Sequence, residues 1–240
     1  ESSFDDEFGA VKFSCLEENF AQVFSLYART IKAPGFDEKR LALSKQLALE
    51  GISRRKDSPE TVAGQILRTG MFGEESPYGG TSSPQSVNAI TRADLLDYWR
   101  WLVRPDFARL VITGSAPKEV VKQLVEEQFG AWQQEPTTHQ IVKSINDYPV
   151  AATPPRPAIY VWERDRQQVN SALGHFGPPR LTADQFAISL FNRWFGVGGF
   201  ESLLFSEIRS RLGLAYSVYG GFFSKAKAGA FGTTFAAPPA

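Results

Sequence analysis

Two polar side chains, Arg209 and Tyr216, stand seven residues apart in the stretch SEIRSRLGLAYSVYGGF (206–222). Arg209 falls in the last turn of a predicted helix, where the helix dipole favours a cation, and Gly213 is a suitable helix stop. Tyr216 then enters a predicted strand. If the guanidinium and the phenol face one cavity, they can donate hydrogen bonds to a peptide carbonyl that becomes an oxyanion. The spacing is also that of an ordinary C-terminal cation and an ordinary strand aromatic, which is the commoner arrangement.

Residues that could bind a metal are sparse. The two histidines, His139 and His175, are 36 residues apart, and no two histidines are spaced i, i+4. The chain therefore predicts no self-contained zinc site of the two-histidine helical type. Glu50 stands on a predicted helix in KQLALEGIS. It is either a carboxylate at the edge of an amphipathic face or a metal ligand whose histidine partners lie elsewhere.

Two other kinds of chemistry are excluded by the motifs. The chain has no G-x-S-x-G elbow, and Cys15 stands in a predicted strand without a nearby histidine, so no hydrolytic nucleophile is predicted. The run GVGGF (196–200) follows a helix rather than a strand and has no Lys-Ser/Thr after it. It predicts a flexible connection or a close approach of two backbones, and not a phosphate-binding loop.

The composition narrows the class of protein further. Of the 240 residues, 42% are hydrophobic and 22% charged, which is typical of a soluble globular protein. The 26 basic and 26 acidic residues balance, so nucleic acid is not an expected partner. No apolar run approaches the length of a membrane span. The opening ESSFDDEFGA has no Met and no leader pattern, so we expect either a processed leader or an internal fragment.

Hydrophobic periodicity and punctuation by Gly and Pro predict mixed secondary structure in both halves. The first half is predicted to hold a strand in 8–16, a buried strand at 108–114 and helices at 16–32, 37–55, 58–72, 95–102 and 117–132. The second is predicted to hold strands at 158–165, 167–177, 214–223 and 229–237 and helices at 186–195 and 201–211. Capping boxes are predicted at Thr91/Asp94 and at Thr182/Gln185.

This element order predicts an α+β fold of two related α/β-roll domains, both partial. Each domain is expected to have an antiparallel or mixed sheet with helices packed on one face. The segment 133–157 has five prolines and little periodicity, and is predicted to be an interdomain linker. The predicted domains are therefore 1–132 and 158–240.

The stretch GGFESLLFSEIRSRLGLAYSV (198–218) resembles the second-domain motif of the pitrilysin–insulinase–mitochondrial processing peptidase family. In that motif a glycine-rich turn precedes an LF-x-E-[LI]-R helix and a G-L-A-Y-S-V strand. The segments 19–59, 76–114 and 167–180 resemble further family motifs in the expected order. By this resemblance Arg209 and Tyr216 hold the positions of a pair that clamps the substrate beside a zinc ion in a facing domain.

The chain also departs from the family pattern. The inverted H-x-x-E-H zinc helix is missing, although Glu50 falls on the position of the third zinc ligand. The acidic residues that the family usually has before this Glu are replaced here by Ala42, Leu43 and Ser44. In a second motif, Ser76 stands where the family has the His of HPYG. The resemblance therefore implies zinc in the family, but not zinc held by this chain alone.

Together these features predict the substrate-binding, non-catalytic part of a zinc-dependent peptidase, inactive on its own. The zinc site would come from another segment or from an H-x-x-E-H subunit in a heterodimer, or the chain would form a homodimer. The expected substrate is a peptide or unfolded protein, and strand 167–177 is a candidate edge for pairing with it. The alternatives are a fragment of a complete zinc endopeptidase with Glu50 as third ligand, and a non-enzymatic scaffold or peptide-binding protein. The family suggests a bacterial periplasmic location.

Overall fold

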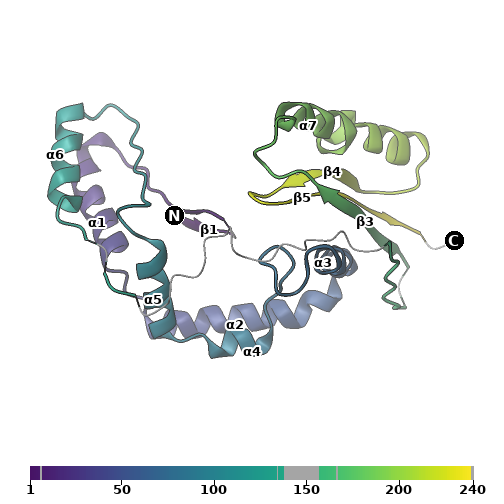
Figure 1. The fold of residues 1–240 in the computed structure, drawn as a ribbon, viewed down its shortest axis with the longest axis horizontal. Helices are drawn as coiled ribbons and strands as arrows, with labels where there is room; N and C mark the ends of the chain where they lie inside the picture. The colour runs from purple at the N-terminus through teal and green to yellow at the C-terminus, as the bar shows by residue number, and fades with distance from the viewer. Residues whose placement is uncertain (6, 134, 138–156, 166, 239–240) are drawn as a thin grey trace. The chain divides into compact units, whose positions relative to one another are not determined.

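The computed structural model describes residues 1–5, 7–133, 135–137, 157–165 and 167–238. These residues form two compact units (Figure 1). Unit 1 consists of 1–50 and 83–142, and unit 2 of 51–82 and 143–240. The division into domains at 1–132 and 158–240 stays a prediction, because most of the predicted linker at 133–157 lies outside the described residues.

Unit 1 is mostly helical. Strands β1 (Ser2–Phe4) and β2 (Gly9–Val11) form an antiparallel hairpin. The helices are η1 (Glu17–Asn19), α1 (Phe20–Lys32), α2 (Glu38–Arg54), α4 (Pro84–Ala89), α5 (Arg92–Leu102) and α6 (Lys118–Phe129), and α2 continues into unit 2. The predicted capping box forms, since Asp94 and Thr91 satisfy each other's backbone N–H groups at the start of α5. Helix α4 was not predicted.

An aromatic cluster between α1 and α6 forms the core of unit 1. Phe24 is fully buried, and its ring centroid lies 5.5 Å from that of Phe20 and 5.8 Å from that of Phe129. The Tyr27 hydroxyl donates a hydrogen bond to the carbonyl of Val11 at 3.2 Å. Burial raises the pKa of Tyr27 above its ordinary value. Apolar residues of α1 at helical spacing thus bury one face, as the sequence indicates.

Two of the predicted strands are wrong. Residues 108–114 and 158–165 are described as irregular backbone. Most of their apolar side chains are exposed: Val111 by 82%, Ile159 by 92% and Val161 by 83%. A strand needs a neighbour for its backbone hydrogen bonds, and no described strand pairs with either segment. The predicted strand at 8–16 is confirmed only over β2, because its described neighbour β1 pairs with Gly9–Val11 alone.

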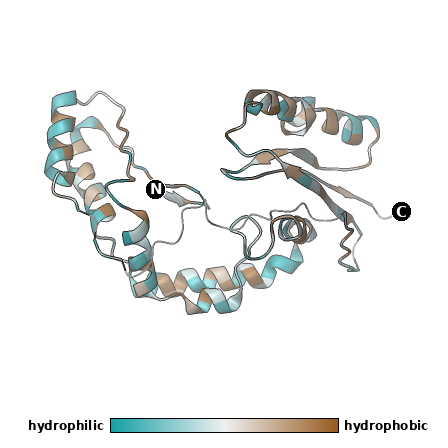
Figure 2. Ribbon diagram, in the orientation of Figure 1, coloured by the Kyte–Doolittle hydropathy of each residue, from teal (hydrophilic) through white to brown (hydrophobic). Residues whose placement is uncertain are grey.

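Unit 2 is built on a three-stranded antiparallel sheet. Its strands β3 (Val169–Gly177), β4 (Val218–Ser224) and β5 (Gly229–Ala237) lie in the order β3-β5-β4. Figure 2 shows hydrophobic residues along these strands and on helix α7. Three of the four strands predicted in the second half are therefore confirmed, within a few residues at their ends.

Helices pack on both faces of this sheet, whereas the sequence predicted one covered face (Figure 1). On one face, Leu67 and Met71 of α3 (Pro59–Phe72) lie beside Gly174, which leaves room for the helix. On the other face, Phe191 of α7 (Gln185–Asn192) contacts Phe222, with ring centroids 5.7 Å apart. The α+β class is confirmed, and the small residue Gly174 explains why the face under α3 accepts a helix as well.

The start of α7 differs from its prediction, and that of α3 agrees. The Ser58 side chain accepts a hydrogen bond from the N–H of Thr61, and Pro59 occupies the first turn of α3. The capping box predicted for α7 does not form; Asp184 precedes the helix without a side-chain cap. The N–H of Gln185 instead donates to the carbonyl oxygen of Thr182 at 3.2 Å. No helix in the described ranges is both long and apolar enough to span a bilayer.

Gly196 is a point of close backbone approach, as the GVGGF run predicted. It is buried in η4 (Arg193–Val197), the π-helical continuation of α7. A Cβ at Gly196 would meet the backbone N of Gly220 at 2.8 Å and the carbonyl oxygen of Gly220 closer still. Any side chain here would push η4 away from β4.

We therefore expect Gly196→Ala to lower the free energy of unfolding of unit 2 by about 1–3 kcal/mol, the usual cost of overpacking. Urea titration followed by circular dichroism measures the change. The matched control is Gly51→Ala, also in unit 2, where an added Cβ has nothing within 4 Å. That control should gain about 0.5–1 kcal/mol from its better helix propensity. An unchanged midpoint for Gly196→Ala would contradict the close approach.

Candidate functional site

The segment that carries Arg209 begins with a fixed turn. After η4, the turn η5 (Gly199–Glu201) starts at Gly199, whose φ of 67° is in the left-handed region. The buried Ser202 donates its hydroxyl to the carbonyl of Gly199 at 2.8 Å. The helix that follows includes the π-helical segment η6 (Phe205–Arg211). The turn therefore sets where Arg209 lies.

Gly213 ends this helix, as the sequence predicted. Its φ is 65°, and its N–H donates to the carbonyl of Arg209 at 3.1 Å. The N–H of Leu214 donates to the carbonyl of Ile208 at 3.0 Å. The two hydrogen bonds cap the end of the helix, as in a Schellman-type glycine C-cap with a wider spacing. Tyr216 lies two residues before β4 begins at Val218. The reversal at Gly213 returns Tyr216 to the end of the helix.

Arg209 and Tyr216 are brought together by this reversal. The guanidinium carbon of Arg209 lies 4.5 Å from the ring centroid of Tyr216, which is within cation–π range. It also lies 4.7 Å from the ring centroid of Phe205 and 6.0 Å from that of Phe200. The guanidinium is thus flanked by the rings of Phe200 in η5, Phe205 in η6 and Tyr216 in the segment before β4.

No carboxylate pairs with Arg209 in the part of the chain that the structure describes. The acidic residue nearest in sequence, Glu207, forms a salt bridge with Arg211 at 2.5 Å. Tyr216 and Phe200 are each 78% exposed. The guanidinium N–H donors and the phenol of this pair are therefore available to a ligand at the surface.

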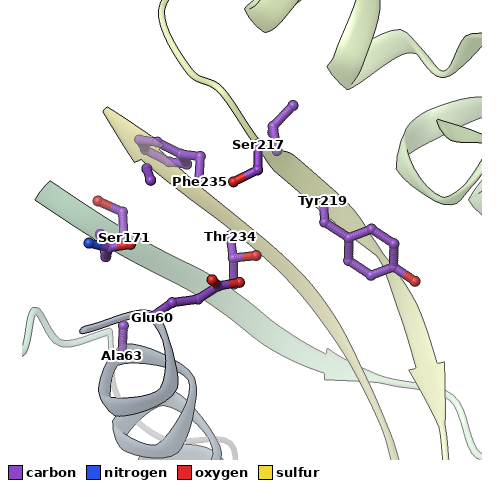
Figure 3. Close-up of a pocket in the computed structure, with 10 residues that line it drawn as sticks. Glu60, Ala63, Ser171, Ser217, Tyr219, Thr234 and Phe235 are labelled. Atoms are coloured by element: carbon purple, nitrogen blue, oxygen red, sulfur yellow. The ribbon is translucent and has the colours of Figure 1, made fainter. Parts of the chain in front are cut away.

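A small cavity is lined by the start of β4 and by Ser217, the residue after Tyr216. Figure 3 shows the Glu60 side chain of α3 reaching toward Thr234 of β5, with Ser171 on β3 and Ser217 just before β4. The cavity measures about 40 Å³. That is room for about three water molecules. It is too small to enclose a large peptide side chain.

The remaining candidate residues are Glu50, the two histidines and Cys15. Glu50 is exposed on α2 and belongs to unit 1, whereas Arg209 and Tyr216 belong to unit 2. His175 is exposed on β3 and stacks on Phe231 with ring centroids 5.1 Å apart. His139 lies outside the described residues. Cys15 is exposed in irregular backbone.

The described residues do not fit a zinc site. Nowhere among them do three His, Cys, Asp or Glu side chains gather so that they could hold a metal ion. Zinc takes three or four such ligands.

Sequence reasoning missed two residues of the site, Phe200 and Phe205. The signal was available, because Phe205 precedes Arg209 by four residues on one helix. In a π-helical turn with i→i+5 hydrogen bonds, residues four or five apart lie above each other. Phe200 lies in a separate turn, and the π winding has no clear signature in the sequence, so only the place of Phe205 could have been predicted.

Comparison with known proteins gives three matches of interest. The family model of the peptidase M16 inactive domain matches residues 89–240. An uncharacterized zinc protease of Mycobacterium leprae is 30% identical over 204 residues, which are 82% of this chain and 43% of that protein. The crystal structure of a peptidase M16 inactive domain from Pseudomonas fluorescens superposes with a TM-score of 0.70 at 24% identity, over 90% of this chain and 51% of that chain.

A further solved structure has the same fold. The periplasmic protease PqqL from Escherichia coli matches with a TM-score of 0.75 at 16% identity, over 93% of this chain and 24% of that chain. At these identities the two structural matches show the fold alone. The chain spans about 43% of the length of the M. leprae relative.

Proposed function

Because the chain belongs to the peptidase M16 family and carries its inactive-type domain, we propose that it is the substrate-binding, non-catalytic part of a zinc-dependent peptidase. In this proposal Arg209 and Tyr216 clamp the scissile peptide. The observation that carries it is the guanidinium of Arg209, 4.5 Å from the Tyr216 ring and without a carboxylate partner among the described residues. The family motif noted in the sequence supports the same pair.

The proposed chemistry follows from the donors of the pair. A guanidinium N–H and the phenol O–H can both donate to one carbonyl oxygen. As that oxygen gains negative charge in the transition state, both hydrogen bonds strengthen, and this selective gain accelerates the reaction. The clamp therefore orients the carbonyl and stabilises the developing charge. It neither attacks the peptide nor abstracts a proton.

Zinc enters the proposal through the relatives. Several curated relatives are named zinc proteases. The ion would activate the attacking water. We propose that it is held by another segment of the protein or by a homologous H-x-x-E-H subunit, because the described residues offer no cluster of ligands.

The outer edge of β3 is the proposed place where an extended peptide pairs with the sheet. Strand β3 lies at one edge of the sheet, and β4 lies at the other. At β4, the side chain of Asn192 occupies the outward backbone groups of Phe222, donating to its carbonyl at 2.8 Å and accepting from its N–H at 2.7 Å. At Phe222 the backbone groups on the β4 edge are therefore already hydrogen-bonded and cannot pair with another strand. This favours the β3 edge for strand addition.

One alternative has an observation in its favour. The curated relatives are more than twice as long as the segment they share with this chain and are named zinc proteases. The chain would then be part of a complete zinc endopeptidase, with Glu50 as the third ligand. This reading keeps the clamp and changes only the source of the zinc site.

The test is cleavage of a quenched fluorogenic peptide library in the presence of zinc. The full-length protein is assayed alone and mixed with an H-x-x-E-H homologue from the same organism. We expect cleavage by the mixture only. Cleavage by the protein alone would favour the complete peptidase with Glu50 as a ligand. Absence of cleavage in every sample would overturn the proposal and favour a scaffold protein.

A further inference from the structure

The guanidinium of Arg209 is held by aromatic rings where an ion pair would be usual. We propose that Phe205 and Phe200 are positioning residues that hold Arg209 in the orientation required by the substrate. The two rings together are called the aromatic box below. This inference rests on the proposed function, because it assigns the box a role in the clamp.

The geometry of the box is fixed by the turn before the helix. The rings of Phe200 and Phe205 meet edge to face, with centroids 4.7 Å apart and planes at 74°. Phe205 lies one π-helical turn before Arg209, with its ring 4.7 Å from the guanidinium carbon. Phe200 belongs to η5, which the Ser202 hydroxyl anchors. Both rings of the aromatic box are thus carried by backbone of defined conformation.

Aromatic rings suit this task better than a carboxylate would. A carboxylate binds a guanidinium in its plane, through two parallel hydrogen bonds, and so occupies the donors that a substrate needs. An aromatic face contacts the flat side of the guanidinium and leaves its N–H groups pointing outward. The box therefore orients Arg209 and keeps its donors available for a neutral carbonyl oxygen.

The exposure of Phe200 separates this role from ordinary core packing. Phe200 is 78% exposed, so it contributes little to burial in unit 2. Its neighbours are the ring of Phe205 and the guanidinium of Arg209. The contacts of Phe200 therefore link it to Arg209 and Phe205 rather than to the core of unit 2.

The test uses Phe205→Leu in the full-length protein, assayed in the active mixture. Leucine keeps an apolar side chain and removes the ring. We expect kcat to fall by about 3- to 30-fold, in line with the strength of a cation–π contact. Phe205→Tyr and Phe205→Trp, which keep a ring, should retain most of the activity. The control is Phe223→Leu, which removes a β4 ring that stacks on Tyr219 and not on Arg209.

A coupling measurement separates positioning from structure. In an Arg209→Met background, Phe205→Leu should cause no further loss of kcat, because the ring acts through the guanidinium. An equal loss in both backgrounds would show a structural role and overturn the inference. So would wild-type activity of Phe205→Leu. If instead Arg209→Met leaves activity unchanged, the proposed function fails as well.

Phe200→Leu provides the same test at an exposed position. If Phe205→Leu does not fold, as judged by its thermal unfolding, the exposed Phe200 still allows the measurement. We expect a smaller loss of kcat for Phe200→Leu, since its ring lies 6.0 Å from the guanidinium carbon. Unchanged kcat in a folded Phe200→Leu would contradict the aromatic box.

Discussion

Replacing Tyr216 by Phe is expected to lower kcat of the assembled peptidase by about a hundred- to a thousand-fold, the usual cost of losing one oxyanion donor. The assembled peptidase is the full-length protein together with its zinc-bearing segment or subunit. Only the hydroxyl is lost, and the ring that lies 4.5 Å from the Arg209 guanidinium carbon remains. Because Tyr216 is 78% exposed, the stability of the folded protein should not change.

The measurement is kcat on a quenched fluorogenic peptide, with thermal unfolding as the check on folding. Tyr219→Phe is the matched control, since Tyr219 is a β4 residue that stacks on Phe223 at 5.9 Å and does not contact Arg209. It should keep wild-type kcat. Equal kcat for Tyr216→Phe and the wild type would mean that the phenol has no part in catalysis.

The second large effect is expected for Arg209→Lys. Lysine keeps the charge but loses the planar fork of donors and the flat face that packs on aromatic rings. We expect kcat to fall about a hundred-fold, because the remaining ammonium is neither oriented by the aromatic box nor able to donate in two parallel directions.

Arg211→Lys is the control for this change, on the same helix and two residues away. Arg211 pairs with Glu207 at 2.5 Å, and a surface pair of this kind contributes little to stability. We expect its kcat to be near that of the wild type. A fall in kcat for Arg211→Lys, with Arg209→Lys fully active, would show that Arg211 contacts the substrate and that Arg209 does not.

Local signals in the sequence predicted much of the fold. The Ser58–Pro59 start of α3 and the Thr91/Asp94 box of α5 depend on neighbouring residues only, and both form. Gly213 stops its helix because its own φ is left-handed. These features could be predicted because each is decided within about one turn of chain. The proximity of Arg209 and Tyr216 was expected from the family motif, since their spacing alone fits two ordinary residues better.

Features that depend on distant partners could not be predicted. The segments 108–114 and 158–165 have the composition of strands, but strand formation requires a neighbour that their own residues do not specify. The packing of α3 on the second face of the sheet depends on the small residue Gly174, which lies about a hundred positions along the chain. The aromatic box depends on π-helical winding, for which propensities give no signal.

The central claim is that Arg209 and Tyr216 bind the transition state more tightly than the substrate. The most direct measurement compares two dissociation constants for the assembled peptidase, before and after Tyr216→Phe. One ligand is an uncleavable ground-state peptide, and the other is a tetrahedral phosphinic analogue of the same sequence. The account predicts that affinity for the analogue falls by about the same factor as kcat/KM, while affinity for the ground-state peptide changes little. An equal loss for both ligands, or no loss for either, would contradict it.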